Sequence, residues 1–260
     1  MTVDPSAPTS SGARGAAGAL VPVAARLAVA VDVPDLAAAR RLVTQLAGHV
    51  DVVKVGLELF SAAGPAAVAA MLEAGFEVFV DVKLHDIPNT VEGAARVLGA
   101  LGAGYVTLHT GGGEAMLRAG VEGLAAGAAG AGLRAPTALG VTVLTSDPKA
   151  TPAVLVERAR LAERAGCGGL VCAGPDLATL RDEAPGLLRV VPGIRPAGSA
   201  VGDQARVMTP EQAVRAGAGL LVVGRPITGA ADPAAAAAAI RKKITQTSRP
   251  DAGGGRQAPR

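Results

Sequence analysis

The chain carries one complete strand-to-helix unit at residues 77–101, with the sequence EVFVDVKLHDIPNTVEGAARVLGAL. Its first part, Glu77–Val82, alternates valine with other residues, and β-branched residues of this kind favour a strand. Its last part, 89–101, begins at Asn89, a good helix N-cap residue, and continues with apolar residues at helical spacing. Charged residues lie between the two. The unit therefore predicts a strand, a polar loop and a helix in immediate succession.

The same succession recurs along the chain, with glycines such as Gly102 and Gly166 where a helix should end. Eight units predict an α/β fold, a single (β/α)8 TIM barrel. A doubly wound sheet is the alternative, but the first strand is not followed by the glycine-rich turn that binds dinucleotides in such sheets. The expected strands are Leu27–Val31, Val52–Val55, Glu77–Val82, Tyr105–His109, Thr137–Val143, Gly169–Cys172, Leu188–Val191 and Leu220–Val223, and the expected helices are roughly 35–47, 61–74, 89–101, 113–128, 151–165, 175–183, 210–216 and 233–245.

The length of 260 residues is typical of one such barrel. We expect the barrel over residues 23–245, a disordered tail at 1–22 and a disordered basic tail at 246–260. Because the excess of basic residues lies mostly after residue 240, the composition does not indicate a nucleic-acid partner. No apolar run approaches the ~18 residues of a membrane span, and the start lacks a signal pattern. We therefore expect a cytoplasmic protein with no membrane partner.

Two of the five lysines lie inside otherwise apolar strands, Lys54 in VVKVG and Lys83 in VDVKL, although the usual cation of this chain is arginine. A lysine ammonium can transfer a proton near neutral pH when its pKa is shifted, whereas a guanidinium effectively cannot. Side chains alternate along a strand, so Asp81 and Lys83 should share one side, about 7 Å apart along the strand. Asp86 follows in the loop, and Asp32 ends the first strand.

Chemistry in a barrel belongs at the carboxyl ends of the strands, and these charged residues all lie there. We therefore expect them to form a catalytic site. The alternative is a purely structural network of ion pairs, although burying charges for stability alone is usually unfavourable.

A second group of residues indicates phosphate binding. Arg195 lies in the loop after the seventh strand, and Gly224 and Arg225 follow the eighth. These two loops are the usual phosphate site of a barrel, and a guanidinium presents paired donors to phosphate oxygens. Gln204, in a polar stretch after Arg195, could close over the anion.

His85 and His109 lie near expected strand ends, close to acidic residues, so a metal site is an alternative to consider. The sequence has neither an HxH nor an HExxH spacing. We therefore expect these histidines to pack or to form hydrogen bonds, and we expect no metal.

Residues 81–90, DVKLHDIPNT, resemble the bacterial form of the signature of orotidine 5′-phosphate decarboxylases. The similarity covers about residues 27–245. It includes the segments Ala30–Asp32, Lys54–Gly56, Val141–Ser146, Pro192–Pro196, Gly202–Gln204, Met208–Ala213 and Val223–Thr228.

The resemblance implies conversion of orotidine 5′-phosphate (OMP) to uridine 5′-phosphate (UMP) and carbon dioxide, the last step of de novo UMP synthesis, without any cofactor. It implies that Lys83 protonates C6 of the pyrimidine and that Asp81 lies beside the substrate carboxylate. It further implies ribose contacts from Asp32 and Lys54, a pyrimidine contact from Thr145, phosphate contacts from Arg195, Gln204, Gly224 and Arg225, and a homodimer in which Asp86, Ile87 and Thr90 reach the partner's site.

Two other functions remain open at this point. A related decarboxylase or aldolase would act on a sugar phosphate with Mg²⁺, but it would add acidic metal ligands on the second strand, where only Glu58 is near, and would lack HDIPNT. A catalytically silent phosphate-binding barrel would bind UMP without releasing carbon dioxide.

Overall fold

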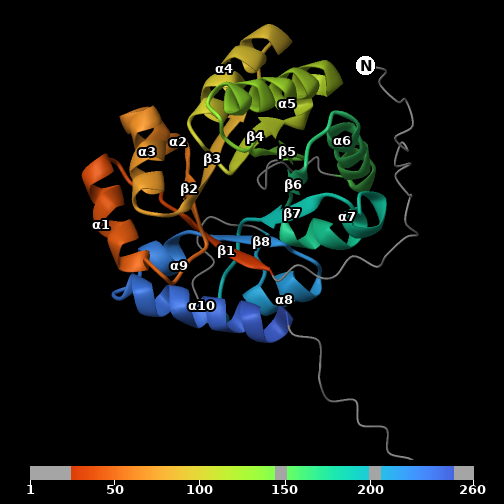
Figure 1. Cartoon of the computed structure of the whole chain (residues 1–260). Coiled ribbons are helices and arrows are strands. Elements are labelled where there is room, and N and C mark those ends of the chain that lie inside the picture. The colour runs from red at the N-terminus through yellow and green to blue at the C-terminus, as the bar shows by residue number, and fades with distance from the viewer. Residues whose placement is uncertain (1–24, 144–150, 199–205, 249–260) are drawn as a thin grey trace, which may run out of the picture.

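The computed structural model describes residues 25–143, 151–198 and 206–248. Its eight parallel strands pair in chain order, and the first closes on the eighth to form a barrel surrounded by helices (Figure 1). The expected (β/α)8 fold is confirmed. The strands are β1 Arg26–Ala30, β2 Val52–Val55, β3 Glu77–Leu84, β4 Tyr105–His109, β5 Thr137–Val141, β6 Gly169–Val171, β7 Leu188–Val191 and β8 Leu220–Val223.

The helices lie close to their expected positions, with three differences. The helix expected over 61–74 is two helices that meet at Gly64, because this glycine has a φ of 55° and the following Pro65 has no N–H to continue the first helix. A short helix not predicted from the sequence follows β8, and the last helix continues past residue 245. The α-helices are α1 Leu36–Leu46, α2 Leu57–Ala63, α3 Pro65–Glu73, α4 Pro88–Ala100, α5 Gly113–Gly130, α6 Pro152–Arg164, α7 Leu177–Glu183, α8 Pro210–Arg215, α9 Arg225–Thr228 and α10 Pro233–Ser248, with 3₁₀ turns at η1 Thr110–Gly112 and η2 Gly174–Asp176.

Small residues let the helices pack closely in this aromatic-poor chain. A Cβ atom added to Gly127 of α5 would lie 1.9 Å from the backbone oxygen of Arg96 in α4, so only glycine fits there. Leucine, valine and alanine fill the layer between helices and strands, while a smaller cluster that includes Phe79 and Tyr105 fills the inside of the barrel. The close packing holds α4, which follows the loop after β3, firmly against α5.

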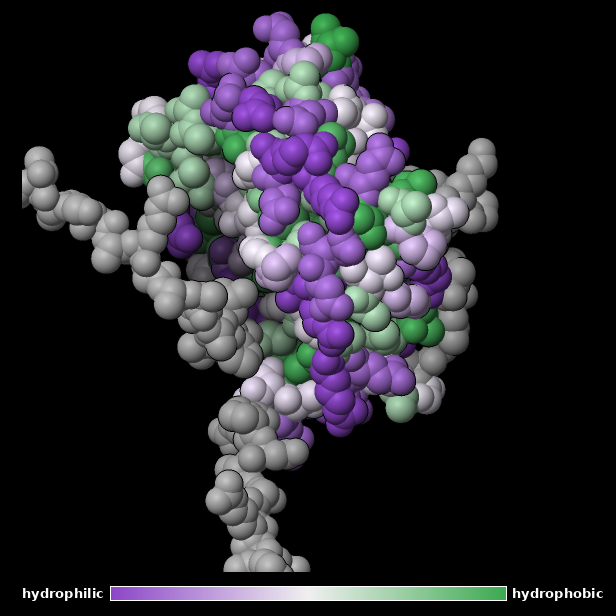
Figure 2. Space-filling view, turned by 90° about the vertical axis from the view of Figure 1, so that its right-hand side faces the viewer, coloured by the Kyte–Doolittle hydropathy of each residue, from purple (hydrophilic) through white to green (hydrophobic). Residues whose placement is uncertain are grey.

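The outer surface of the helix layer is polar where α6 and α7 lie, and Figure 2 shows hydrophilic residues gathered over this side. Ion pairs join neighbouring helices, such as Arg160 with Glu183 and Arg164 with Glu114.

Among the described helices, none is both long and apolar enough to cross a membrane. Cys167 and Cys172 are unpaired, and burial raises the pKa of both thiols to about 12.

Candidate active site

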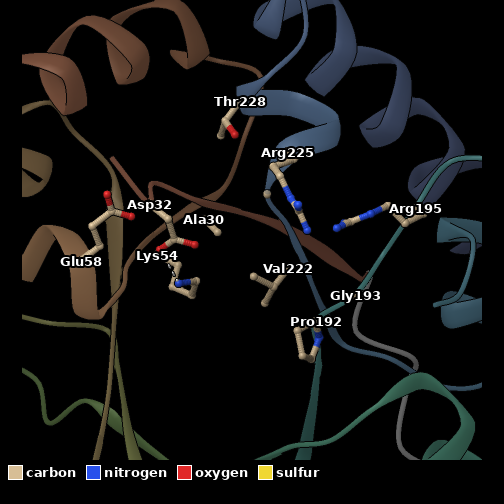
Figure 3. Close-up of a pocket in the computed structure, with 11 residues that line it drawn as sticks. Ala30, Asp32, Lys54, Glu58, Pro192, Gly193, Arg195, Val222, Arg225 and Thr228 are labelled. Carbon is tan, nitrogen blue, oxygen red and sulfur yellow. Dashed lines mark hydrogen bonds and ion pairs between the residues drawn. The ribbon is translucent and has the colours of Figure 1, made fainter. Parts of the chain in front are cut away.

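A pocket of about 400 Å³ lies at the carboxyl ends of the strands. It has two chemically different ends (Figure 3): Asp32 and Lys54 lie at one, and Arg195 and Arg225 lie at the other. Small apolar side chains separate the two ends. The full lining is Ala30, Asp32, Lys54, Glu58, Pro192, Gly193, Arg195, Val222, Gly224, Arg225 and Thr228.

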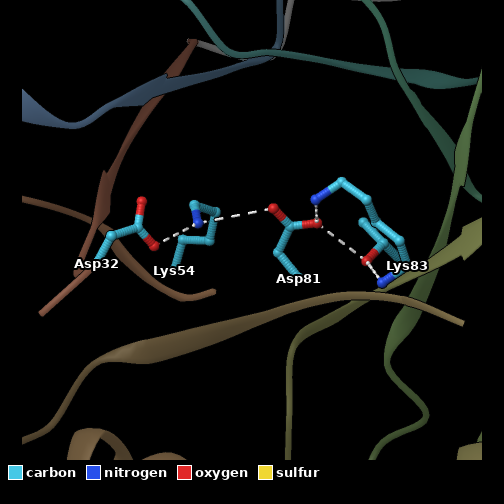
Figure 4. A network of polar contacts seen from close by, with 5 residues as sticks. Asp32, Lys54, Asp81 and Lys83 are labelled. Atoms are coloured by element: carbon cyan, nitrogen blue, oxygen red, sulfur yellow. Dashed lines mark hydrogen bonds and ion pairs between the residues drawn. The ribbon is translucent and has the colours of Figure 1, made fainter. Parts of the chain in front are cut away.

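Four charged side chains form a continuous row (Figure 4), and we call Asp32, Lys54, Asp81 and Lys83 the charge array. Asp32 and Lys54 line the first end of the pocket, and the row continues beyond the lining residues to Asp81 and Lys83. The ammonium of Lys54 lies 3.0 Å from Oδ1 of Asp32 and 3.6 Å from Oδ2 of Asp81. The ammonium of Lys83 lies 2.9 Å from Oδ1 of Asp81. The structure therefore brings these four residues together, while Asp86, which the sequence placed with them, is not among them. Asp81 lies between the two lysines and offsets the repulsion between them, and Asp32 adds a second negative charge beside Lys54.

The array is tightly enclosed on its Lys54 side. Lys54 is only 8% exposed, and the charge of such a buried group must be compensated by its partners. Gly56 makes room for both partners, since a Cβ atom at this position would lie 2.3 Å from Oδ1 of Asp32 and 2.7 Å from the Lys54 ammonium. The close approach of the backbone to these charged side chains explains why a glycine directly follows β2.

The backbone of Lys83 is strained. Its φ is 49°, the one positive value at a non-glycine residue in the described part of the chain. Such a conformation costs on the order of 1–3 kcal/mol and persists only where the surroundings hold it. The pairing of β3 with β4 shifts register between Val80 and Leu84, so the strand bulges where Asp81 and Lys83 lie. The two side chains therefore meet at an irregular part of the strand, where the sequence predicted regular alternation.

Sequence reasoning missed Thr107, a completely buried residue of β4 that contacts this bulge. Its hydroxyl accepts a hydrogen bond from the Lys83 backbone N–H at 2.8 Å and donates one to Oδ1 of Asp81 at 3.1 Å. A threonine inside a strand is common, so the sequence carried no signal for this contact.

At the second end of the pocket, the side chains of Arg195 and Arg225 point toward one another (Figure 3). Burial, and to a smaller extent the positive charge of Arg225, lower the pKa of Arg195. Two guanidinium groups that converge in this way present paired donors to an anion, and phosphate oxygens match these donors. The geometry fits the expected phosphate site.

Contacts with the chain segment 206–208 hold Arg195 in place. Its backbone N–H donates to the carbonyl of Met208 at 2.9 Å, and Ile194 pairs with Met208 as an isolated parallel bridge. Arg206 forms an ion pair with Asp176, a buried residue of the turn η2. The segment that pairs with the Arg195 backbone is therefore itself anchored to the turn η2.

Other expected site residues lie elsewhere. Asp86, Ile87 and Thr90 are exposed and do not line this pocket; Oδ1 of Asp86 instead accepts a hydrogen bond from the Ile87 N–H at 2.7 Å. Thr145 and Gln204 lie outside the described residues. Thr228, from the short helix α9, lines the pocket and was not predicted.

The two histidines near the array pack against each other. The rings of His85 and His109 are stacked, with centroids 4.9 Å apart, and Nδ1 of His109 accepts a hydrogen bond from the Gly111 N–H. Burial, followed by the charges of His85, Arg158 and Lys83, lowers the pKa of His109. In the described ranges, no three or more His, Cys, Asp or Glu side chains are grouped as metal ligands would be.

The model of the Orotidine 5′-phosphate decarboxylase / HUMPS family matches residues 25–240. The chain belongs to this family. Proteins named orotidine 5′-phosphate decarboxylase are similar over most of their length: the one from Anaeromyxobacter sp. (strain K) is 53% identical over 226 residues, covering 83% of this chain and 96% of the relative. The one from Moorella thermoacetica is 48% identical over 231 residues, covering 84% and 92%.

A solved structure of the same family supports the fold. The crystal structure of orotidine 5′-phosphate decarboxylase from Lactobacillus acidophilus superimposes with a TM-score of 0.74 at 34% identity, covering 85% of this chain and 99% of that one. The family resemblance expected from the sequence is therefore confirmed.

Proposed function

We propose that this protein decarboxylates OMP to UMP and carbon dioxide in de novo pyrimidine synthesis. The observation that carries the proposal is the pocket with the charge array at one end and two converging guanidinium groups at the other. OMP has a carboxylated pyrimidine at one end and a phosphate at the other, so it matches both ends at once. Membership of the family, and relatives at 53% and 48% identity, support the same activity.

The chemistry follows from the charge array. Loss of carbon dioxide from C6 leaves an electron pair on a ring carbon with no adjacent electron sink, so a fixed cation must stabilise it. The Lys83 ammonium supplies this charge and donates the proton that completes UMP. Asp81 holds that ammonium at 2.9 Å and faces the substrate carboxylate. No step requires a metal ion or an organic cofactor.

The remaining substrate contacts are assigned by the family resemblance. Asp32 and Lys54 contact the ribose hydroxyls, and Thr145 contacts the pyrimidine edge. Arg195, Gln204, Gly224 and Arg225 hold the phosphate. The pocket supports these roles for the members that line it, Asp32, Lys54, Arg195, Gly224 and Arg225.

The proposal includes a homodimer in which Asp86, Ile87 and Thr90 complete the partner's site. Two observations support it. All three residues are exposed, and Ile87, at 65%, is an unusually exposed large apolar side chain. Val97 of the adjoining helix α4 is also exposed, at 57%.

Because both cysteines are unpaired and the substrate is an intracellular nucleotide, we place the enzyme in the cytoplasm.

The test follows the loss of OMP absorbance and the release of carbon dioxide, with and without EDTA. We expect one carbon dioxide and one UMP per OMP consumed, at a rate that EDTA does not change. Loss of turnover in EDTA would favour a metal-dependent family member acting on a sugar phosphate. Binding of UMP without carbon dioxide release would indicate a silent phosphate-binding barrel.

Gly56→Ala should reduce activity because the new methyl group would overlap Asp32 and Lys54. Displacing catalytic groups by about 1 Å costs up to roughly 100-fold in rate, so we expect kcat/KM for OMP to fall roughly 10- to 100-fold. The matched control is Gly130→Ala at the exposed end of α5, where a Cβ atom meets nothing within 4 Å and kcat/KM should not change. Equal activity of the two variants would show that Gly56 is not needed for the array.

A further inference from the structure

The bulge in β3 leaves a gap in its pairing with β4. Between the paired positions Val80–Val106 and Leu84–Leu108, β3 advances by four residues while β4 advances by two. A strand N–H that loses its ladder partner must find another acceptor, because an unpaired buried amide costs free energy. Thr107 is the one β4 residue inside this interval, and its hydroxyl accepts the hydrogen bond of the Lys83 N–H at 2.8 Å.

The same hydroxyl has a defined orientation. A backbone N–H can only donate, so the Thr107 oxygen acts as acceptor toward Lys83 and its own proton is available for Oδ1 of Asp81, 3.1 Å away. Oδ1 of Asp81 also receives the Lys83 ammonium, while Oδ2 faces Lys54 at 3.6 Å. The bond from Thr107 thus fixes which carboxylate oxygen each lysine meets.

We propose that Thr107 is a positioning residue of the reaction, whose single hydroxyl holds Lys83 in its left-handed backbone conformation and Asp81 in its orientation. Two facts make the role specific: Lys83 has a φ of 49°, and Thr107 has an exposed fraction of 0%, so water does not replace its hydroxyl. Without the hydroxyl, the Lys83 backbone relaxes toward an ordinary conformation and its ammonium moves relative to C6 of the substrate. The kinetic part of this inference rests on the proposed decarboxylation.

The test compares Thr107→Val, which keeps the shape of the side chain and removes the hydroxyl, with Thr107→Ser, which keeps the hydroxyl. We expect kcat for OMP to fall roughly 10- to 100-fold in Thr107→Val, as for a displacement of about 1 Å. KM should stay close to that of the unchanged protein, since Arg195 and Arg225 are untouched. Thr107→Ser should recover most of kcat.

Thr110→Val is the matched control. Thr110 is 1% exposed, and its hydroxyl lies 2.7 Å from the carbonyl of Val141 and 3.2 Å from that of Thr142, so this variant also loses a buried hydroxyl at the end of β4. Its kcat should not change. The proposal is overturned if Thr107→Val keeps full kcat, if Thr107→Ser is as slow as Thr107→Val, or if Thr110→Val is equally slow.

A second readout does not depend on turnover. Amide hydrogen exchange at Lys83 should be protected in the unchanged protein and in Thr107→Ser, and should accelerate in Thr107→Val, because the acceptor of that N–H is gone. Unchanged protection in Thr107→Val overturns the role of the hydroxyl. If the unchanged protein fails to decarboxylate OMP, the proposed function fails, and exchange at Lys83 alone then decides whether Thr107 holds the bulge.

Discussion

Lys83→Ala should abolish turnover of OMP while leaving UMP binding measurable. The substitution removes both the cation that stabilises the developing charge at C6 and the proton donor. A general acid contributes typically 10²- to 10⁴-fold and an electrostatic stabiliser about 10²- to 10³-fold, so we expect kcat to fall by at least roughly 10⁴-fold. Carbon dioxide release under single-turnover conditions measures the loss, and calorimetry measures binding of UMP.

Binding should persist because the phosphate end of the pocket is separate from Lys83. Arg195 and Arg225 lie on the opposite side of the pocket from Asp32 and Lys54 of the charge array (Figure 3), and Lys83 does not line this pocket. The matched control is Lys242→Ala, an exposed lysine on α10 outside the pocket, which should keep full activity. Turnover near the normal rate in Lys83→Ala would remove Lys83 as the proton donor, and loss of UMP binding would show that the variant had lost the pocket itself.

The positions of the charge array could be predicted from sequence because barrel geometry is periodic. Once eight strands are recognised, a charged residue at the end of an apolar strand must lie at the mouth of the barrel. Asp32, Lys54 and Asp81 each satisfy this. In the structure, the Lys54 ammonium lies within 3.6 Å of a carboxylate oxygen of both Asp32 and Asp81. The scarcity of lysine was a second indication of the catalytic site, since only Lys54 and Lys83 of the five lysines lie in otherwise apolar strand sequences.

The local backbone of the site could not be predicted in the same way. Strand alternation is an average rule, and the bulge at Lys83 includes a tertiary contact with Thr107 on the next strand that the sequence does not reveal. The break between α2 and α3 shows the opposite case: Gly64 and Pro65 are visible in the sequence, but the apolar pattern continues across them and favours one helix. Asp86 illustrates a third limit, because the role that we propose for it in a neighbouring subunit has no signature in the spacing of one chain.

Arg225→Ala should mainly raise KM for OMP and leave kcat nearly unchanged. Arg225 is exposed and belongs to the short helix α9, so its removal should disturb the fold less than removal of the buried Arg195. Hydrogen bonds to charged groups contribute roughly 1.5–3 kcal/mol, which corresponds to an increase in KM of roughly 10- to 150-fold. Initial rates over a range of OMP concentrations separate the two constants.

The nucleoside orotidine, which lacks the phosphate, provides the discriminating control for Arg225→Ala. If Arg225 acts on the phosphate, kcat/KM for orotidine should be the same in the variant and in the unchanged protein, and only OMP should be affected. Arg160→Ala, which removes an exposed arginine of α6, should leave kcat/KM for both substrates unchanged. Equal losses for OMP and orotidine would mean that Arg225 supports the shape of the pocket and not the phosphate, and an unchanged KM for OMP would remove it from the site altogether.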